Sequence, residues 1–187
     1  MADRWTQELQ DAAAEKSLVR IERARFPAEF AEGVPLAVGT DLVVLALVDV
    51  DHFRPNGFGI FRLADLSDVR SDEYERFMER VLEGEGTPVN RLEPPDVRID
   101  DWRQAARDLA RSGELVIVEA EESQEDEFWL GRIVDVDDDG IWLLPLGALG
   151  EWDDESVAIT FGEITQIRFG ERYAEVYGRY AGPPPVE

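Results

Sequence analysis

The segment that sets the architecture of this chain, residues 128–169, reads FWLGRIVDVDDDGIWLLPLGALGEWDDESVAITFGEITQIRF. Apolar and polar residues alternate on both sides of Asp137–Gly140, which predicts two strands joined by a tight hairpin in which Asp-Gly supplies positive φ angles. Similar alternation predicts strands at Val157–Phe161 and Ile164–Phe169, with Gly162-Glu163 as the turn between them. Short strands joined by tight turns favour a small antiparallel barrel over an open sheet.

Helices are expected on both sides of these strands. Apolar residues recur at helical spacing in residues 3–15, where Asp3 is the expected cap, and again after Asp100, which is expected to cap another helix. Ser71 or Asp72 is expected to cap a helix with a predicted apolar face of Tyr74, Phe77, Met78, Val81 and Leu82. The closing helix has a predicted apolar face of Tyr173, Val176, Tyr177 and Tyr180.

The first half of the chain carries its own strand signals. Strands are predicted there at Leu18–Ile21, Leu36–Val38, Leu42–Val48, Phe58–Leu63 and Leu66–Val69. Asn56-Gly57 is a strong signal for a hairpin turn. Residues 83–95 are rich in Gly, Pro and acidic side chains and are predicted to form a linker, and Glu119–Glu127 is predicted to form an acidic loop.

The second half repeats the order of the first. Similar residues are separated by a nearly constant offset, which is 97 for Trp5 and Trp102, 98 for Gly33 and Gly131, and 99 for Tyr74 and Tyr173. The sequence therefore predicts an α+β protein that arose by internal duplication. Each repeat is a helix, a small antiparallel barrel and a second helix, and the expected repeats are residues 1–93 and 94–187.

This pattern resembles the Sm-like and SH3-like small barrels. The residues that carry the resemblance are Gly131-Arg132-Ile133, Asp138–Ile141, Val157-Ala158-Ile159 and Glu163–Ile167, with a weaker copy in the first half. Sm-like proteins typically form rings by pairing the end strands of neighbouring barrels, and they often bind RNA. The resemblance therefore implies that three chains, with six barrels, form a pseudo-hexameric ring.

The charge of the chain limits its partners. It has 42 acidic and 19 basic residues, for a formal net charge of −23, and Lys16 is its only lysine. Such a molecule repels phosphate backbones, which disfavours nucleic acid as a partner. Three explanations of the acidity stay open: solubility, a cytoplasm of high salt concentration, or the capture of a basic partner protein.

Other absences in the sequence exclude several classes of chemistry. The chain has no cysteine, which excludes disulfides and thiolate chemistry. No apolar run is long enough to span a bilayer, and the start lacks a signal-peptide pattern, so the cytoplasm is the expected compartment. We find no phosphate-binding loop, nucleophile elbow or paired histidines, and we expect no enzymatic activity and no cofactor.

Two acidic segments are candidate sites with simpler explanations. Asp135–Gly140 matches the first half of a calcium-binding loop, but its twelfth position is Leu146 rather than the required glutamate. We therefore expect a hairpin turn and no metal site. His52, the only histidine, lies between Asp49 and Asp51 and is expected to be a solvated loop side chain.

The tryptophans are the remaining candidates for an interface. Trp129 and Trp152 lie near predicted loops and are possible contact residues, whereas Trp142 is expected in the barrel core. Arg62, Arg132 and Arg168 are expected to pair with nearby acidic side chains.

These observations predict a non-enzymatic cytoplasmic protein that acts by protein–protein contact or self-assembly of its two barrels. An acidic inhibitor or immunity-like protein that captures a basic partner is the alternative. An Sm-like RNA-binding module is the third hypothesis, and it requires a basic patch that the sequence does not supply.

Overall fold

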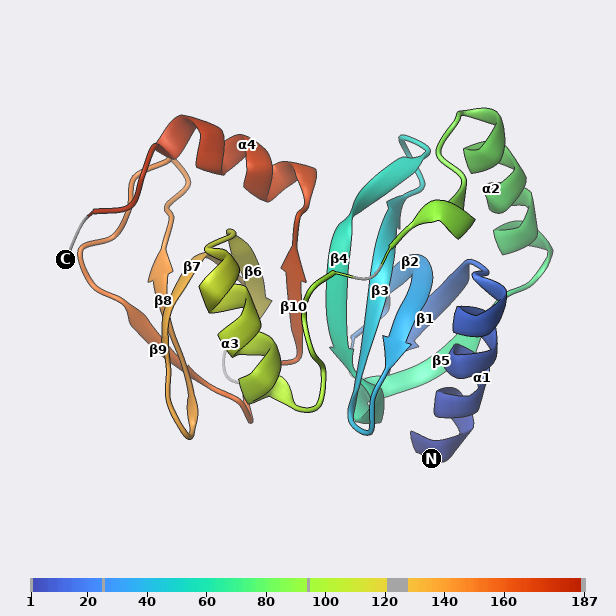
Figure 1. The fold of residues 1–187 in the computed structure, drawn as a ribbon, viewed down its shortest axis with the longest axis horizontal. Coiled ribbons are helices and arrows are strands. Elements are labelled where there is room, and N and C mark those ends of the chain that lie inside the picture. Colours follow the sequence, from blue (N-terminus) through green and yellow to red (C-terminus); the bar gives the residue numbers. More distant parts are fainter. Residues whose placement is uncertain (1, 25, 94, 121–127, 186–187) are drawn as a thin grey trace. The chain divides into compact units, whose positions relative to one another are not determined.

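The computed structural model describes residues 2–24, 26–93, 95–120 and 128–185, so most of the predicted acidic loop Glu119–Glu127 lies outside the described residues. The chain divides into two compact units, residues 1–95 and 96–187. Each unit has an α-helix before and after five antiparallel strands, which makes the protein α+β (Figure 1). No helix in the described part is long and apolar enough to cross a membrane.

The first unit contains the helices α1 (Ala2–Glu15) and α2 (Glu73–Gly84), the strands β1 (Val19–Arg23), β2 (Phe26–Val38), β3 (Leu42–Asp49), β4 (Arg54–Arg62) and β5 (Leu66–Arg70), and the short 3-10 helices η1 (Leu63–Asp65) and η2 (Val89–Arg91). Its strands pair in the order β5-β1-β2-β3-β4. Every pairing between these neighbours is antiparallel.

The second unit contains the helices α3 (Trp102–Ser112) and α4 (Arg172–Ala181) and the strands β6 (Val116–Glu119), β7 (Phe128–Val136), β8 (Gly140–Pro145), β9 (Val157–Thr160) and β10 (Gln166–Phe169). Its strands pair in the order β10-β6-β7-β8-β9, again antiparallel. If each unit's strands are counted from one to five, this order is that of the first unit.

The registers of the strand pairs also agree between the units. Val19 pairs with Gly33, and Val116 pairs with Gly131. The pairing of β2 with β3 shifts between Pro35 and Ala37, and that of β7 with β8 shifts between Ile133 and Asp135, which lie 98 positions later. We call residues matched when they are separated by 97 positions in the first helix and strand, by 98 in the later strands and by 99 in the closing helix.

Two matched glycines explain part of this agreement. A Cβ at Gly33 would lie 2.5 Å from the carbonyl oxygen of Ala46, and one at Gly131 would lie 2.2 Å from that of Leu144. A side chain at either position would therefore collide with the backbone of the neighbouring strand. The same requirement holds at Gly140, whose φ is not positive: its Cβ would lie 2.2 Å from the carbonyl oxygen of Ile159. The predicted Asp137–Gly140 hairpin turn is present, but close approach and not a positive φ explains its glycine.

The sheet of each unit is open, which differs from the predicted closed barrel. Among the described strands of a unit, the pairings run in a line from the fifth strand to the fourth without joining these two ends. In the first unit the α1 residues Trp5 and Leu9 occupy the same core as Phe61, Leu66 and Val69 from the two ends of the sheet. A helix thus covers apolar surface that strand closure would have covered.

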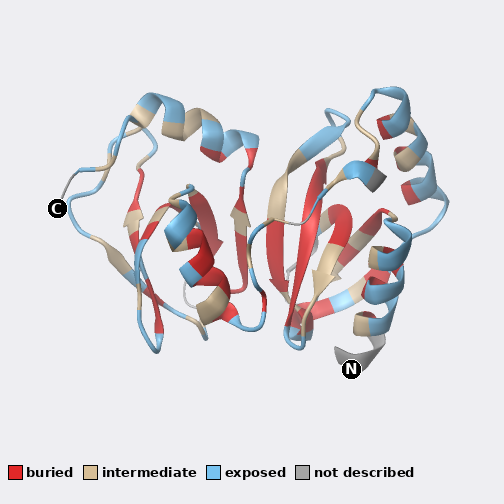
Figure 2. Cartoon of the chain, viewed as in Figure 1, coloured by how far each residue is buried: buried red, intermediate tan, exposed pale blue. Residues whose placement is uncertain are grey.

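The second helix of each unit packs on a different set of sheet residues. Met78 and Leu82 of α2 share a core with Leu18, Val34, Val48 and Val89, and Ala174 of α4 packs with Ile117, Leu130 and Leu146. Buried residues accordingly lie in the strands and on one side of each helix (Figure 2). The predicted apolar faces are right only in part. Met78 and Leu82 are buried and Tyr177 packs against a core cluster, but Tyr74, Phe77, Tyr173 and Tyr180 are exposed.

Three local predictions need correction. α1 begins at Ala2, so Asp3 lies inside the helix and not before it. The cap of α3 is Asp101, which accepts from the backbone N–H of Gln104, rather than Asp100. Asn56-Gly57 lies within β4, where the register with β3 shifts and Gly57 has a φ of 74°. The positive φ therefore serves a β-bulge instead of a hairpin turn.

Candidate functional site

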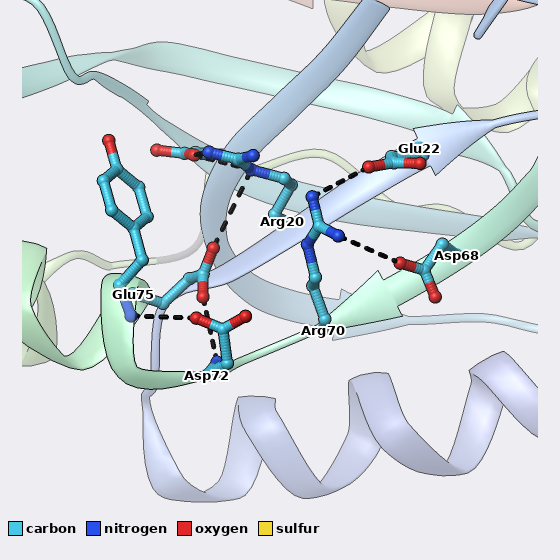
Figure 3. A network of polar contacts seen from close by, with 8 residues as sticks. Arg20, Glu22, Asp68, Arg70, Asp72 and Glu75 are labelled. Atoms are coloured by element: carbon cyan, nitrogen blue, oxygen red, sulfur yellow. Dashed lines mark hydrogen bonds and ion pairs between the residues drawn. The ribbon is translucent and has the colours of Figure 1, made fainter.

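Three charged side chains meet in the first unit beneath its surface. Arg20 lies on β1, Glu32 on β2 and Glu75 in the first turn of α2. The two glutamate side chains are each 1% exposed, and that of Arg20 is 20% exposed. Nε of Arg20 donates to Oε1 of Glu32 at 2.8 Å and lies 3.8 Å from Oε1 of Glu75. We call these three residues the ion cluster; Figure 3 labels two of them, Arg20 and Glu75.

Backbone structure places each member of the ion cluster. Arg20 and Glu32 are direct cross-strand partners in the pairing of β1 with β2, so their side chains lie on one face of the sheet. Glu75 takes part in a capping box, in which its Oε2 accepts from the backbone N–H of Asp72 at 2.9 Å and Asp72 accepts from that of Tyr74. The same glutamate therefore begins the helix and reaches the arginine, as Figure 3 shows.

Two exposed aromatic rings flank the arginine of this cluster. The guanidinium carbon of Arg20 lies 4.2 Å from the ring centre of Phe30 and 5.2 Å from that of Tyr74. Phe30 is 52% exposed and Tyr74 is 42% exposed. Both rings lie within cation–π distance of the guanidinium, and much of their surface is open to solvent. We call Phe30 and Tyr74 the aromatic pair.

The ion cluster contains more acidic than basic groups. It holds two carboxylates and one guanidinium, and Oε2 of Glu32 is buried without a hydrogen-bond partner in the described part of the chain. Burial raises the pKa of Glu75, although the N–H of Asp72 opposes this. Burial, together with the charge of Glu32, raises the pKa of the Tyr74 hydroxyl. The tyrosine is therefore neutral and able to donate a hydrogen bond.

The second unit has no counterpart of the ion cluster at the matched positions. Arg20, Glu32 and Glu75 match Ile117, Leu130 and Ala174, which belong to one apolar core cluster. The aromatic pair, in contrast, matches Phe128 and Tyr173, which are 53% and 45% exposed. The surface aromatics are thus present in both units, and the residues beneath them differ completely.

A second ionic contact is present in both units. Arg70 on β5 donates to Glu22 on β1 at 2.9 Å, and the matched Arg168 on β10 donates to Glu119 on β6 at 2.7 Å. Arg70 also lies 3.8 Å from Asp68. Figure 3 draws both contacts of Arg70. These pairs join the first and fifth strands of each unit, so we assign them to the fold rather than to a site.

The three tryptophans considered as candidates belong to the second unit. Trp129 is half-buried on β7, and Trp152 is half-buried against α4, where its Nε1 lies 3.3 Å from the carbonyl oxygen of Gly182. Their predicted contact role stays a prediction. Trp142 is 39% exposed, so its expected place in the core is wrong. It projects outward because Ile141 and Leu143 take the inward positions of β8.

The other predicted residues are engaged locally. Nδ1 of His52 contacts the Asp49 carboxylate at 2.9 Å on an exposed turn. Asp137 accepts from the N–H groups of Asp139 and Gly140, which uses the supposed calcium ligand to close a hairpin. No group of three potential ligands in the described residues is arranged to hold a metal ion.

Three arginines were predicted to pair with acidic side chains, and two of them do. Arg168 pairs with Glu119 and Glu171, and Arg62 lies 3.7 Å from Asp65. Arg132 instead donates to the carbonyl oxygen of Gly113.

Neither the ion cluster nor the aromatic pair was predicted from the sequence. A comparison of matched positions contains the signal, because Arg20 and Glu32 stand where Ile117 and Leu130 stand in the other half. The chain has no match among protein-family models, curated proteins or solved structures. Arguments about function therefore rest on these residues alone.

Proposed function

We propose that this protein is a tandem duplication of one Sm- or SH3-like unit, and that it works in the cytoplasm as a non-enzymatic protein-binding protein. Its partner is a protein with a basic surface, and the contact is centred on the aromatic pair, Phe30 and Tyr74. The single observation that carries the proposal is the exposure of these rings beside Arg20, with exposed aromatics at the matched positions Phe128 and Tyr173.

The duplication is supported by registers that a shared fold class does not require. Strand order, cross-strand partners and the position of an irregular pair all recur at offsets of 97 or 98. The matched pairs Gly33–Gly131 and Trp5–Trp102 also have matching structural roles: the glycines permit close strand approach, and the tryptophans are buried in the first helix of each unit. One ancestral unit copied in tandem explains this agreement.

The contact role is supported by the physical state of the aromatic pair. Exposed aromatic residues are enriched among the residues that dominate binding energy at protein interfaces. Rings that are already fixed by a cation–π contact lose little further freedom when a partner covers them. Aromatic rings that only stabilise their own chain are instead expected in its core, where Trp5 and Trp102 lie.

The basic character of the partner is supported by charge. The net charge of −23 attracts basic proteins over long range and accelerates their association at low salt. The ion cluster adds two buried carboxylates against one guanidinium directly beneath the rings. A partner with basic residues around an apolar or aromatic anchor complements this surface.

The proposal is tested with the double variant Phe30→Ala/Tyr74→Ala. Immobilised wild-type chain is expected to retain a basic protein at low salt and release it as the salt concentration rises. The variant is expected to lose that protein with at least a tenfold drop in affinity, because truncation of central aromatic anchors costs about 2 kcal/mol or more. Circular dichroism confirms that the variant remains folded.

The matched control is Phe128→Ala/Tyr173→Ala in the second unit, which removes the same ring area at a site without the ion cluster. Retention of the same protein by this control assigns the contact to the first unit. Equal retention by wild type and the Phe30→Ala/Tyr74→Ala variant would refute the proposed contact surface.

Self-assembly is the second candidate function. Among the described strands of its own unit, β5 pairs only with β1, and β9 pairs only with β8, so each of these strands has one side that its own sheet does not use. A strand with such a side can pair with another chain. A closed ring of three chains satisfies these strands without leaving an open end.

A further inference from the structure

The first unit contains a groove between its two helices. The groove has a volume of about 700 Å³, within the range of about 300–1,000 Å³ that is typical of small-molecule sites. Its apolar lining includes Val19, Val69 and Val89. The other lining residues come mainly from α1, from α2 and from the turn after α1, so the whole groove belongs to one unit.

The two helices present charges of different sign to this groove. The α1 wall carries the carboxylates of Glu8, Asp11 and Glu15, which recur at a spacing of three and four residues on one helix face. The α2 wall carries Arg76 and Arg80, which are one helical turn apart. The lining also contains Glu79 and Glu83 of α2, and it has five acidic and four basic residues in total.

The two arginines of the α2 wall are not committed to carboxylates. Nη1 of Arg76 lies 3.5 Å from the carbonyl oxygen of Ser71, and Nη1 of Arg80 donates to the carbonyl oxygen of Arg76 at 3.0 Å. Neither guanidinium forms an ion pair within the described part of the chain, although acidic residues outnumber basic ones by more than two to one. The neighbouring Glu79 is already engaged, because it accepts from the backbone N–H of Leu18 at 2.6 Å.

One residue that lines the groove, Lys16, has a strained backbone conformation. Lys16, the only lysine in the chain, lines the groove with a φ of 53°, a left-handed conformation that favours glycine. The matched residue of the second unit is Gly113, with a φ of 70°. Non-glycine residues in this conformation are concentrated at functional sites. At this position the first unit therefore has a charged residue with a strained backbone, whereas the second unit has glycine, which adopts such a φ without strain.

We propose that this groove binds a small dipolar ligand that carries a carboxylate and an ammonium group, as a free amino acid or a short peptide does. The carboxylate is bound by Arg76, Arg80 and Lys16, and the ammonium group by the carboxylates of α1. The lining has one more acidic residue than basic residues, which disfavours a ligand that carries only negative charge. The proposal is independent of the aromatic pair and of the partner protein.

The probe is a set of Ala-X dipeptides in which X covers the genetically encoded side chains, titrated into the full-length protein. Binding is followed by NMR through the Nε–H signals of the arginines. At least one free dipeptide is expected to bind with a Kd below about 1 mM. Its N-acetylated form lacks the ammonium group and its C-terminal amide lacks the carboxylate, and each is expected to bind at least about tenfold more weakly.

Substitutions locate the site and separate binding from folding. Arg80→Gln is expected to weaken binding about tenfold, whereas the matched control Arg179→Gln on α4 leaves it unchanged. Lys16→Gly is expected to weaken binding while raising the melting temperature, because glycine relieves the strained φ. A merely structural role for Lys16 predicts no loss of affinity in this variant.

Three results would overturn the proposal. The first is that none of the free dipeptides binds. The second is that the acetylated or amidated forms bind as tightly as the free dipeptide, which would show that the two charges are not read together. The third is that Arg179→Gln weakens binding as much as Arg80→Gln, which would indicate nonspecific attraction to arginine.

Discussion

Single residues carry the main difference between the two units. Where the first unit buries Arg20, Glu32 and Glu75, the matched residues of the second unit are apolar. Buried ion pairs contribute little net stability, because removing charges from water costs about as much as their attraction returns. The second unit of the same chain packs apolar residues at the matched positions. The ion cluster is therefore better explained by a role of the aromatic pair above it than by a gain in stability.

Transplanting the residues of the second unit tests this explanation. The triple variant Arg20→Ile/Glu32→Leu/Glu75→Ala is expected to unfold in urea with a free energy equal to wild type or higher by about 1–4 kcal/mol. Arg20→Ile alone is expected to lower that free energy by about 3 kcal/mol, because it leaves two buried carboxylates without their cation. A triple variant less stable than the single one would contradict the explanation.

Elements differ in how well the sequence predicts them. Strands with partial alternation, such as β7 and β8, and a helix cap such as Asp72 depend on neighbouring residues, and the sequence predicts both. Which side of a helix faces the core depends on the residues that the helix packs against. In α2 and α4 one buried residue lies directly after a tyrosine that was predicted to be buried. Glu75 follows Tyr74 and meets a charged partner on β1, and the small Ala174 follows Tyr173 and joins the apolar cluster of the second unit.

The candidate site was hidden for the same reason. Its cross-strand pair, Arg20 and Glu32, depends on register, and its third member, Glu75, comes from a helix more than forty residues later. Composition and local periodicity hold no information about such contacts. The open sheet was not predicted for the same reason. The sequence does not reveal that Trp5 and Leu9 of α1 cover the apolar surface that strand closure was expected to cover.

The start of α3 provides a prediction at the scale of an element. Asp108 of α3 accepts from the backbone N–H of Arg98 at 3.0 Å and from its guanidinium at 2.8 and 3.0 Å, and it also contacts Arg111 at 2.7 Å. The bonds from Arg98 hold the pKa of Asp108 well below its usual range despite burial. The carboxylate thus ties the segment before α3 to the helix.

A lowered carboxylate pKa stabilises the fold above the unfolded-state pKa of about 4, and this contribution is lost as the pH falls toward the folded-state value. We expect Asp108→Asn to lower the free energy of unfolding by about 1 kcal/mol at pH 7, because both arginines are largely exposed and screened. The difference should vanish at low pH in urea titrations. A difference that is constant across pH would show that the charge of Asp108 plays no part.

The whole molecule combines two similar units with a large negative charge. If unit edges pair between chains, three chains of 21.2 kDa form a particle of about 64 kDa. Repulsion between chains of charge −23 opposes this at low salt and is screened within about 3 Å at 1 M. We therefore expect light scattering to detect the trimer most clearly at molar salt.

A mass of 21.2 kDa at every salt concentration would exclude the ring and leave contact with a different protein as the function. A mass that grows without limit would indicate open, head-to-tail pairing of strand edges instead of closure.

The strained lysine has a practical consequence. An amine-reactive dye can modify only the α-amino group and Lys16, and Lys16 is exposed beside the groove. Lys16 therefore already provides a single side-chain amine for attachment, without any engineered residue. An environment-sensitive fluorophore placed there would report directly on whatever enters between the helices, and acylation of the same amine would turn the natural protein into its own blocked control.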